Sequence, residues 1–447
     1  MNGMLYCLIF AMYTEEKCKR HGSPFLKGAK LILIVAVMIG LAPRTVRAAD
    51  ERTNTATVDS KASADADLLK NLRREIDGVE ALYTAYSKTT NDDLSAKYWK
   101  AYTETNDSLV PKVFDAVRQF PNSPMAFGLL EWVVTNGRLS VPSLRPYGPQ
   151  AVELLREHYT LHTNISEVCK QLGFFGDPLN QPTVDFLQIA ATNNPNRAAR
   201  GAATFALARL TKRKGEDMAF LLSAPASIYT NAAAVKARAM FQSDPKGSEG
   251  VLREAEQLFQ TVQSDYADVP NFLPGPGLRE PKRTLGEQAA IELYDCEHLT
   301  VGKVAPDIQG EDIDGHKLKL SNFRGKVVLI SFWASWCGPC MQMVPHEREI
   351  AQRLGGKPFV LIGVNGDSEK AAAKRAVAEQ KMTWQSFWNN GSEGGIAGTW
   401  NVHGWPTVYL LDSTGTIRLK LDGYGGKRTD VLLDAMVDQW VEQAATK

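Results

Sequence analysis

The sequence predicts a multidomain protein in which an all-α domain is followed by a three-layer α/β domain. The chain has 447 residues, more than one hydrophobic core usually serves. Apolar residues recur three and four positions apart between residues 67 and 272, which is the period of an amphipathic helix. After residue 301, short apolar runs typical of buried strands alternate with helical stretches, and this alternation favours a layered sheet.

The first 48 residues have the features of a secretory signal peptide. Two lysines precede the apolar run at 31–41, and the small residues Val46 and Ala48 lie at the −3 and −1 positions of a cleavage site. The run is too short to span a bilayer as a helix, which takes about 20 residues. We therefore expect cleavage near Ala48 and export to the periplasm or cell envelope, with an uncleaved membrane anchor as the alternative.

The charge balance gives no indication of a nucleic-acid partner. Residues 1–48 hold seven Lys or Arg and two Glu, so the remaining chain has 44 basic and 48 acidic side chains, a net charge of −4. Proteins that bind nucleic acids usually carry a basic excess. The charged runs at 210–217 and 278–283 are interpreted as solvated surface.

The segment before the α/β domain is expected to be helical after a short lead-in. Residues 49–66 are small and polar, which predicts a flexible segment, and the helical domain follows at 67–272. Turns rich in Asn, Asp and Pro interrupt it at 120–124, 193–196 and 267–270. Helix pairs hinged at such turns favour a helical repeat array that binds a protein partner. Because no repeat consensus recurs, an irregular helical bundle is the alternative.

A linker is expected at 273–300, before the α/β domain at 301–447. The linker is rich in Pro, Gly and charged residues and contains a short helical pattern at 284–295. The strands predicted in the last domain are 327–333, 358–365, 406–412 and the edge strand 416–421. The helices predicted there are 340–354, 368–381 and 428–445.

Two of the six cysteines, Cys337 and Cys340, lie close together in the segment SFWASWCGPC. A zinc site would need a second pair of ligands, and the nearby His346 and His403 do not supply one. A purely structural disulfide between the two cysteines would close a loop too small to stabilise the fold much. The sequence therefore favours a dithiol that performs redox chemistry, without a metal or a cofactor.

The neighbouring residues support this redox hypothesis. A strand that ends at Trp333 and a helix that begins at the cysteines would place Cys337 at the helix N-terminus, where free N–H groups and the helix dipole favour an exposed thiolate. Pro339 suits the first turn, because its missing N–H would be unpaired there anyway. Cys340 would lie one turn further along, where it can expel a partner bound to Cys337.

The segments WCGPC and GWPTVYLLD resemble the thioredoxin superfamily, and more narrowly its exported TlpA-like or redoxin branch. The resemblance covers about residues 301–445. It implies a thioredoxin-like fold, a disulfide between the catalytic Cys337 and Cys340, and a cis-proline at Pro406 that faces them. The substrate-binding residues that it implies are Trp336, Gly338, Pro339, Trp405 and Pro406.

The resemblance also implies a direction of electron flow. A Gly-Pro dipeptide between the cysteines is similar to that of thioredoxin, a reductant with a potential of about −270 mV. We therefore expect a reductase of protein disulfides. In an oxidising compartment, it would need a membrane dithiol as electron donor.

Two positions depart from the family pattern. Thioredoxins have a buried aspartate where this chain has Ser331, and TlpA-like proteins often have a glutamate where it has Met343. A carboxylate at either position would help to deprotonate Cys340. Glu347 lies two helical turns from Cys340, too far for direct proton transfer, so a water chain is the expected substitute.

Alternatives remain for the other cysteines and for the function. Cys169 and Cys296 are either buried free thiols or a bridge between the two domains, and Cys296 could have an accessory redox role. A thiol peroxidase is a second candidate function, although the peroxide-activating Pro-x-x-x-Thr-x-x-Cys pattern is absent before Cys337. A helical scaffold with a vestigial redox domain is the third.

Overall fold

A computed structural model describes residues 54–446, apart from 90, 122, 137–146, 226–227, 229–231 and 272–282. The predicted signal peptide at 1–48 lies outside these residues. The described chain forms two compact units, one that ends at His158 and one that begins at Tyr159 and continues to the C-terminus. No helix of the described part is long and apolar enough to cross a membrane.

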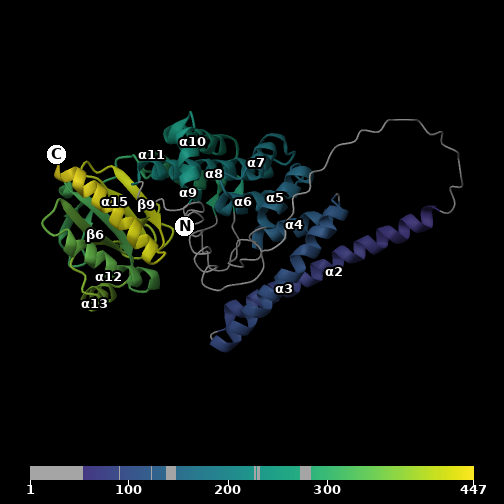
Figure 1. Cartoon of the computed structure of the whole chain (residues 1–447), viewed down its shortest axis with the longest axis horizontal. Helices are drawn as coiled ribbons and strands as arrows, with labels where there is room; N and C mark the ends of the chain where they lie inside the picture. The colour runs from purple at the N-terminus through teal and green to yellow at the C-terminus, as the bar shows by residue number, and fades with distance from the viewer. Residues whose placement is uncertain are drawn as a thin grey trace. The chain divides into compact units, whose positions relative to one another are not determined.

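The described residues of the first unit form helices. Its helices are α2 (Asn54–Lys88), α3 (Asp92–Gln119), α4 (Pro124–Asn136) and α5 (Tyr147–His158). Helices α2 and α3 pack side by side (Figure 1), joined by an ion pair of 3.0 Å between Lys112 and Glu75. Asn91 caps α3, because its side chain accepts a hydrogen bond from the N–H of Leu94.

The start of α2 differs from the sequence prediction. Residues 54–66 belong to this helix, whereas their small and polar composition predicted a flexible lead-in at 49–66. Four alanines from Ala56 to Ala66 explain the difference, since alanine has the highest helix propensity of all residues.

The helices of the second unit are arranged around α8. They are α6 (Ser166–Phe175), α7 (Gln181–Asn193), α8 (Arg197–Ser223), α9 (Ala232–Gln242), α10 (Gly247–Asp265) and α11 (Leu285–His298). The small side chains of α8 let α6, α7 and α10 approach closely. A Cβ at Gly173 would lie 2.8 Å from the Cα of Ala206, so the contact between α6 and α8 requires glycine. A regular repeat array is not confirmed.

A five-stranded sheet forms the centre of the C-terminal part, with the order β7-β6-β5-β8-β9. The strands are β5 (Val327–Trp333), β6 (Phe359–Asn365), β7 (Ser386–Trp388), β8 (Thr407–Leu411) and β9 (Ile417–Asp422). Strands β5, β6 and β7 are parallel, whereas β8 pairs antiparallel with both β5 and β9. Two further antiparallel pairs of short strands join β1 (Pro270–Asn271) with β2 (Arg283–Thr284) and β3 (Gln309–Glu311) with β4 (Lys317–Lys319).

Apolar side chains cover both faces of the sheet. The helices of this part are α12 (Gly338–Arg353), α13 (Lys370–Glu379), α14 (Gly395–Thr399) and α15 (Lys427–Ala445), with a 3-10 turn at Leu320–Phe323. Val327 and Leu329 of β5 pack with residues of α12 and α15, whereas Val328 and Ile330 pack on the other face with Trp400 and Tyr409. The seven residues of β5 are all buried, as expected for a central strand covered on both faces.

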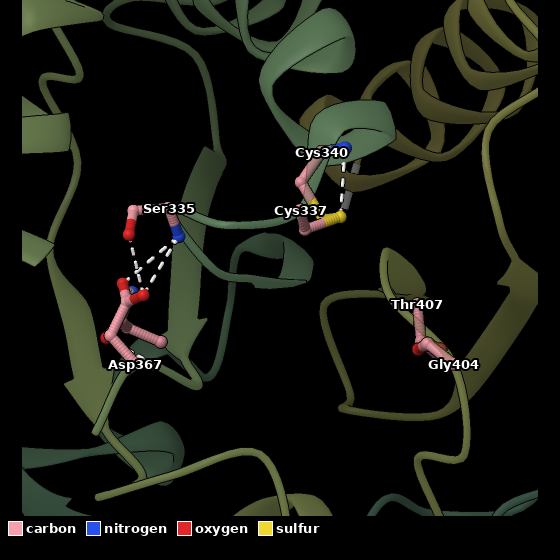
Figure 2. Close-up of a disulfide and its surroundings, with 7 residues drawn as sticks. Ser335, Cys337, Cys340, Asp367, Gly404 and Thr407 are labelled. Carbon is pink, nitrogen blue, oxygen red and sulfur yellow. Dashed lines mark hydrogen bonds between the residues drawn. A yellow bond between two sulfur atoms is a disulfide. The ribbon is translucent and has the colours of Figure 1, made fainter. Parts of the chain in front are cut away.

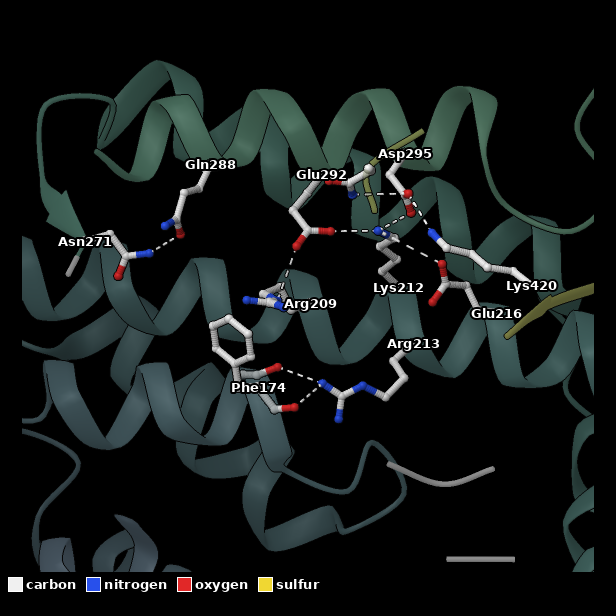
Figure 3. Close-up of polar contacts among 12 residues, drawn as sticks. Phe174, Arg209, Lys212, Arg213, Glu216, Asn271, Gln288, Glu292, Asp295 and Lys420 are labelled. Atoms are coloured by element: carbon white, nitrogen blue, oxygen red, sulfur yellow. Dashed lines mark hydrogen bonds and ion pairs between the residues drawn. The ribbon is translucent and has the colours of Figure 1, made fainter. Parts of the chain in front are cut away.

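The boundary between compact units differs from the predicted domain boundary. The prediction placed all helices to residue 272 in one domain and the α/β domain at 301–447, but α6 to α11 belong to the same unit as the sheet. Buried charges hold them together: Asp295 of α11 accepts a hydrogen bond from Lys420 of β9 and forms an ion pair with Lys212 of α8 (Figure 3). The prediction missed this because the three residues lie far apart in the sequence.

Candidate active site

The two close cysteines form a disulfide at the start of α12 (Figure 2). Strand β5 ends at Trp333, a short turn follows, and Cys337 is the N-cap residue of the helix. Pro339 lies in the first turn, as expected. The N–H of Cys340 donates a hydrogen bond of 3.1 Å to the Sγ of Cys337. In the reduced protein, this N–H and the helix dipole would favour the thiolate of Cys337.

The sulfur of Cys337 is less accessible than predicted. Cys337 is 4% exposed in the disulfide form, whereas the sequence predicted an exposed sulfur. Cys337 packs in an apolar cluster with Cys340, Trp333 and Val344, against which the half-buried Trp405 also packs. This cluster covers most of the disulfide in its oxidised form.

The predicted tryptophans and proline lie together beside the disulfide. The peptide bond between Trp405 and Pro406 is cis, and β8 begins at the next residue. The rings of Trp336 and Trp405 are 6.0 Å apart in an edge-on contact. Trp336 is 58% exposed, so it offers an apolar platform next to Cys337. A side chain at Gly366 would collide with the ring of Trp405, which explains the glycine there.

Asp367 holds the turn that precedes Cys337, a role that the sequence analysis missed. Its buried carboxylate accepts hydrogen bonds from the N–H of Ser335 at 3.1 Å and from the Ser335 hydroxyl at 2.7 Å (Figure 2). The side chain of Asn365 donates to the same carboxylate at 2.8 Å. Asp367 follows β6, the parallel neighbour of β5, and the carboxyl ends of parallel strands meet at one edge of a sheet. The expected parallel pairing of these two strands was the sequence signal that could have placed Asp367 next to this turn.

A buried carboxyl group lies behind the disulfide. Ser331 belongs to the same row of β5 as Val327 and Leu329, so it faces α12, where Glu347 lies. Glu347 is 2% exposed, and burial raises its pKa to about 7, with the neighbouring Ser331 hydroxyl acting in the opposite direction. Ser331 and Met343 stand where the family has acidic residues, and neither is acidic. The carboxyl group of Glu347 nevertheless lies next to one of these positions, Ser331.

Comparisons with known proteins agree with this geometry. The AhpC/TSA family model matches residues 301–420. The thiol-disulfide oxidoreductase ResA of Bacillus cereus (strain ZK / E33L) is 30% identical over 129 residues, which cover 29% of this chain and 73% of that protein. This chain belongs to the thioredoxin-like thiol-disulfide oxidoreductases. It is therefore an oxidoreductase whose redox domain lies in the C-terminal part.

Two further comparisons match the redox domain of this oxidoreductase. The thioredoxin-like protein YneN of Bacillus subtilis (strain 168) is 32% identical over 117 residues, covering 26% of this chain and 68% of that protein. The crystal structure of the thioredoxin domain of a thiol-disulfide oxidoreductase from Bacteroides vulgatus is 28% identical, with a TM-score of 0.28. It covers 32% of this chain and 97% of that one.

The single cysteines of the oxidoreductase are not bridged. Cys169 of α6 and Cys296 of α11 are both free and buried, which contradicts the hypothesis of a disulfide between them. Burial raises the pKa of both thiols far above the usual value of a cysteine. A thiol that stays protonated is a poor nucleophile, so the structure also disfavours an accessory redox role for Cys296.

Neutralising Glu347 is expected to change how stability depends on pH. Its pKa is raised from 4.5 to about 7 in the folded protein, so the folded state loses stability as pH rises from about 4.5 to 7. Glu347→Gln cannot ionise. We expect it to match the wild type near pH 4 and to be more stable by about 2 to 3 kcal/mol at pH 8. Urea denaturation at several pH values measures this difference.

The matched control is Glu349→Gln, on the same helix. The Glu349 side chain is 76% exposed, so its replacement should leave the pH dependence unchanged. If the free energy of unfolding of Glu347→Gln changes with pH in the same way as that of the wild type across this range, the raised pKa of Glu347 is contradicted.

Proposed function

We propose that this oxidoreductase is an exported reductase of protein disulfides that works through the Cys337–Cys340 dithiol. The observation that carries the proposal is the position of Cys337, which is the N-cap residue of α12 and lies next to the exposed Trp336 and the cis-Pro406 loop. The helix favours a reactive thiolate, and the adjacent apolar surface can hold a polypeptide. Trp336, Gly338, Pro339, Trp405 and Pro406 are the proposed substrate-binding residues.

The reaction proceeds by two exchanges of sulfur partners. The Cys337 thiolate attacks one sulfur of the substrate disulfide, a mixed disulfide forms, and the other substrate sulfur leaves as a thiolate. Cys340 then loses its proton and attacks the Sγ of Cys337. The Cys337–Cys340 disulfide forms as the second substrate sulfur leaves. Two electrons pass to the substrate, and its two thiolates take up the two protons that the dithiol releases.

The oxidised dithiol must be reduced again for the next turnover. The small residues Val46 and Ala48 after an apolar run support export to the periplasm or cell envelope. Disulfides persist in such compartments because no soluble thiol pool keeps them reduced. A membrane protein with its own dithiol is therefore the class of partner that we propose as electron donor. The helices outside the redox domain would bind a further protein partner.

Replacing Cys340 with serine tests the mechanism directly. The variant keeps the attacking sulfur of Cys337 but cannot resolve the mixed disulfide, so we expect it to accumulate a covalent adduct with insulin as the probe substrate. Non-reducing electrophoresis would show the adduct, and reductant would release it. The same approach in cells would capture physiological substrates.

The control for trapping is the double variant Cys337→Ser/Cys340→Ser, which should form no adduct. An adduct that forms equally in this control would place the reactive sulfur elsewhere. Absence of any adduct in Cys340→Ser, together with no insulin reduction by the wild type, would leave the scaffold hypothesis.

The match to the AhpC/TSA family favours a thiol peroxidase as the second candidate. Such an enzyme would show rapid loss of the Cys337 thiolate when mixed with hydrogen peroxide in stopped flow. The turn before Cys337 lacks the Pro and Thr of the peroxide-activating pattern, and we therefore rank disulfide reduction first.

A further inference from the structure

A pocket lies beside the cis-proline loop, within the second compact unit. Its volume is about 350 Å³, and α8, α11 and the residues before Trp405 line it. His403 and Gly404 belong to the lining and directly precede the Trp405–Pro406 bond. The pocket therefore borders the loop at which the substrate disulfide would react.

The helices fix the loop that borders this pocket. Asn401 has a positive φ of 48°, and its side chain donates a hydrogen bond of 3.2 Å to Asp295 of α11. Asp295 also accepts a hydrogen bond of 2.7 Å from Lys420 of β9. The wall of the pocket and the reactive loop are thus held by the same carboxylate, which makes the pocket a stable feature next to the substrate path.

Most charged groups of the lining are paired. Arg209 lies 3.3 Å from Glu292, and Lys212 binds Glu292 at 2.6 Å and also pairs with Asp295 (Figure 3). The charges in these ion pairs neutralise one another. The pairs therefore shape the wall of the pocket but leave no charge available to bind a ligand.

Two guanidinium groups of the lining have no carboxylate partner among the described residues. Arg213 is 7% exposed and donates only to the backbone carbonyls of Gly173, Phe174 and Gly176, at 2.8 Å each. Figure 3 shows its guanidinium beside Phe174. These bonds use three of its five N–H groups. Arg283 of β2 is half-buried, and no side-chain bond or ion pair is found for it within the described part of the chain.

The neighbouring carboxyl of Asp217 neutralises Arg213 only in part. Asp217 lies one turn along α8, and burial raises its pKa to about 8, which disfavours its ionised form near neutral pH. A buried guanidinium that contacts only neutral carbonyls is costly to maintain without a counter-ion. Arginine binds carboxylates through two parallel hydrogen bonds, which makes a carboxylate the anion that suits this pocket.

The rest of the lining limits where the anion can lie and what carries it. Asp422 also lines the pocket and accepts a hydrogen bond of 3.2 Å from Thr407, so an anion would avoid that side. Phe174, Phe175 and Ile291 form an apolar part, which suits the methylene groups of a side chain. The occupant is thus a carboxylate on a short apolar stem.

We propose that this pocket is a recognition subsite for a Glu or Asp side chain of the substrate polypeptide, close in sequence to the disulfide that is reduced. The inference rests on the proposed function, because it places the substrate at the Pro406 loop. It assigns α8 and α11 a direct part in choosing substrates.

The test compares two synthetic peptides that contain the same disulfide-closed loop. One has three Glu residues next to the loop, and the other has three Gln residues. Single-turnover reduction by the pre-reduced full-length protein is followed by acid quench and chromatography at several peptide concentrations. We expect the Glu peptide to half-saturate the protein at about threefold to tenfold lower concentration, with the difference shrinking at high salt.

Variants of Arg283 connect this preference with the pocket. Arg283→Gln should bring the two half-saturation concentrations together, and Arg283→Glu should reverse their order. Arg253→Gln is the matched control, since Arg253 is exposed on α10 and does not line the pocket; it should keep the preference. Arg213 is a poorer choice for the test because its loss would disturb the carbonyls that it holds.

Binding of a peptide without cysteines separates this inference from the proposed function. The Glu peptide with both cysteines replaced by serine is labelled, and fluorescence anisotropy measures its binding to the oxidised protein and to Arg283→Glu. Weaker binding to Arg283→Glu supports the subsite even if the protein reduces neither peptide, a result that would overturn only the reductase. Reduction of both peptides without a preference, or a preference that persists in Arg283→Glu, would overturn the subsite and leave the reductase intact.

Discussion

Replacing Cys337 with serine is expected to abolish disulfide reduction, with a loss of at least about 1,000-fold in the rate of insulin reduction. A serine hydroxyl has no accessible anion near neutral pH, and the alkoxide would not be expelled from an adduct with sulfur in the second exchange. The helix N-terminus that stabilises a thiolate cannot compensate, because it acts on a charge that serine does not develop. Turbidity of reduced insulin measures the rate, and a thermal melt checks that the variant is folded.

The control for this variant is Cys169→Ala. Cys169 is buried in α6 and has a raised pKa, so its loss should change the rate less than twofold. A Cys337→Ser variant that keeps a tenth of the wild-type rate would show that another group attacks the substrate. Since the other described cysteines are Cys340 and two buried free thiols, the search would turn to Cys340 first.

The redox domain could be predicted well because its strongest signals are local. Strands β5, β6 and β8 are apolar runs bounded by turns, and the prediction placed each within one residue of its observed ends. Strand β7 was missed, since Ser386–Trp388 is three residues long and its sequence has no alternation. Its position depends on pairing with β6, which a local pattern does not contain.

In the candidate site, too, the features carried by local motifs were predicted, whereas those that depend on contacts between distant elements were missed. The cysteines, Pro339 and Pro406 belong to contiguous motifs, and the structure contains the Cys337–Cys340 disulfide and a cis Trp405–Pro406 bond. The contacts of Asp367 and the burial of Glu347 arise from packing between elements, so no local pattern reported them. A specific error concerned residues 210–217, interpreted as solvated surface, in which Lys212, Arg213 and Asp217 are buried. The partners of Lys212 lie on α11 and those of Arg213 lie on and just after α6, remote in the sequence.

Asp295→Ala is expected to lower the free energy of unfolding by about 3 to 5 kcal/mol. Asp295 is fully buried and pairs with both Lys212 and Lys420, and its removal leaves two buried ammonium groups with fewer counter-charges. Urea denaturation monitored by tryptophan fluorescence measures the loss. The control is Glu254→Gln, which removes an exposed ion pair with Lys246 and should change the free energy by less than about 1 kcal/mol.

The same cluster gives this prediction a pH dependence with a defined sign. Lys212 and the other cations hold the pKa of Asp295 well below its usual value and lower that of Glu292 from 4.5 to about 2, against the effect of burial. Groups with a lowered folded pKa stabilise the fold above their unfolded pKa and lose that effect in acid. Wild-type stability should therefore fall as pH drops from about 4.5 to 2, and the part due to Asp295 should be missing in Asp295→Ala.

Apolar replacement of the Asp295–Lys420 pair distinguishes the cost of an unpaired charge from the value of the pair. Replacing Asp295 with leucine and Lys420 with methionine removes both charges together, and such replacements are often neutral or stabilising. Lys212 keeps its ion pair with Glu292 in this variant. The double variant should thus be more stable than Asp295→Ala alone. If it is the less stable of the two, the ion pair itself holds α11 against β9, and the loss in Asp295→Ala measures a favourable interaction instead of a stranded ammonium group.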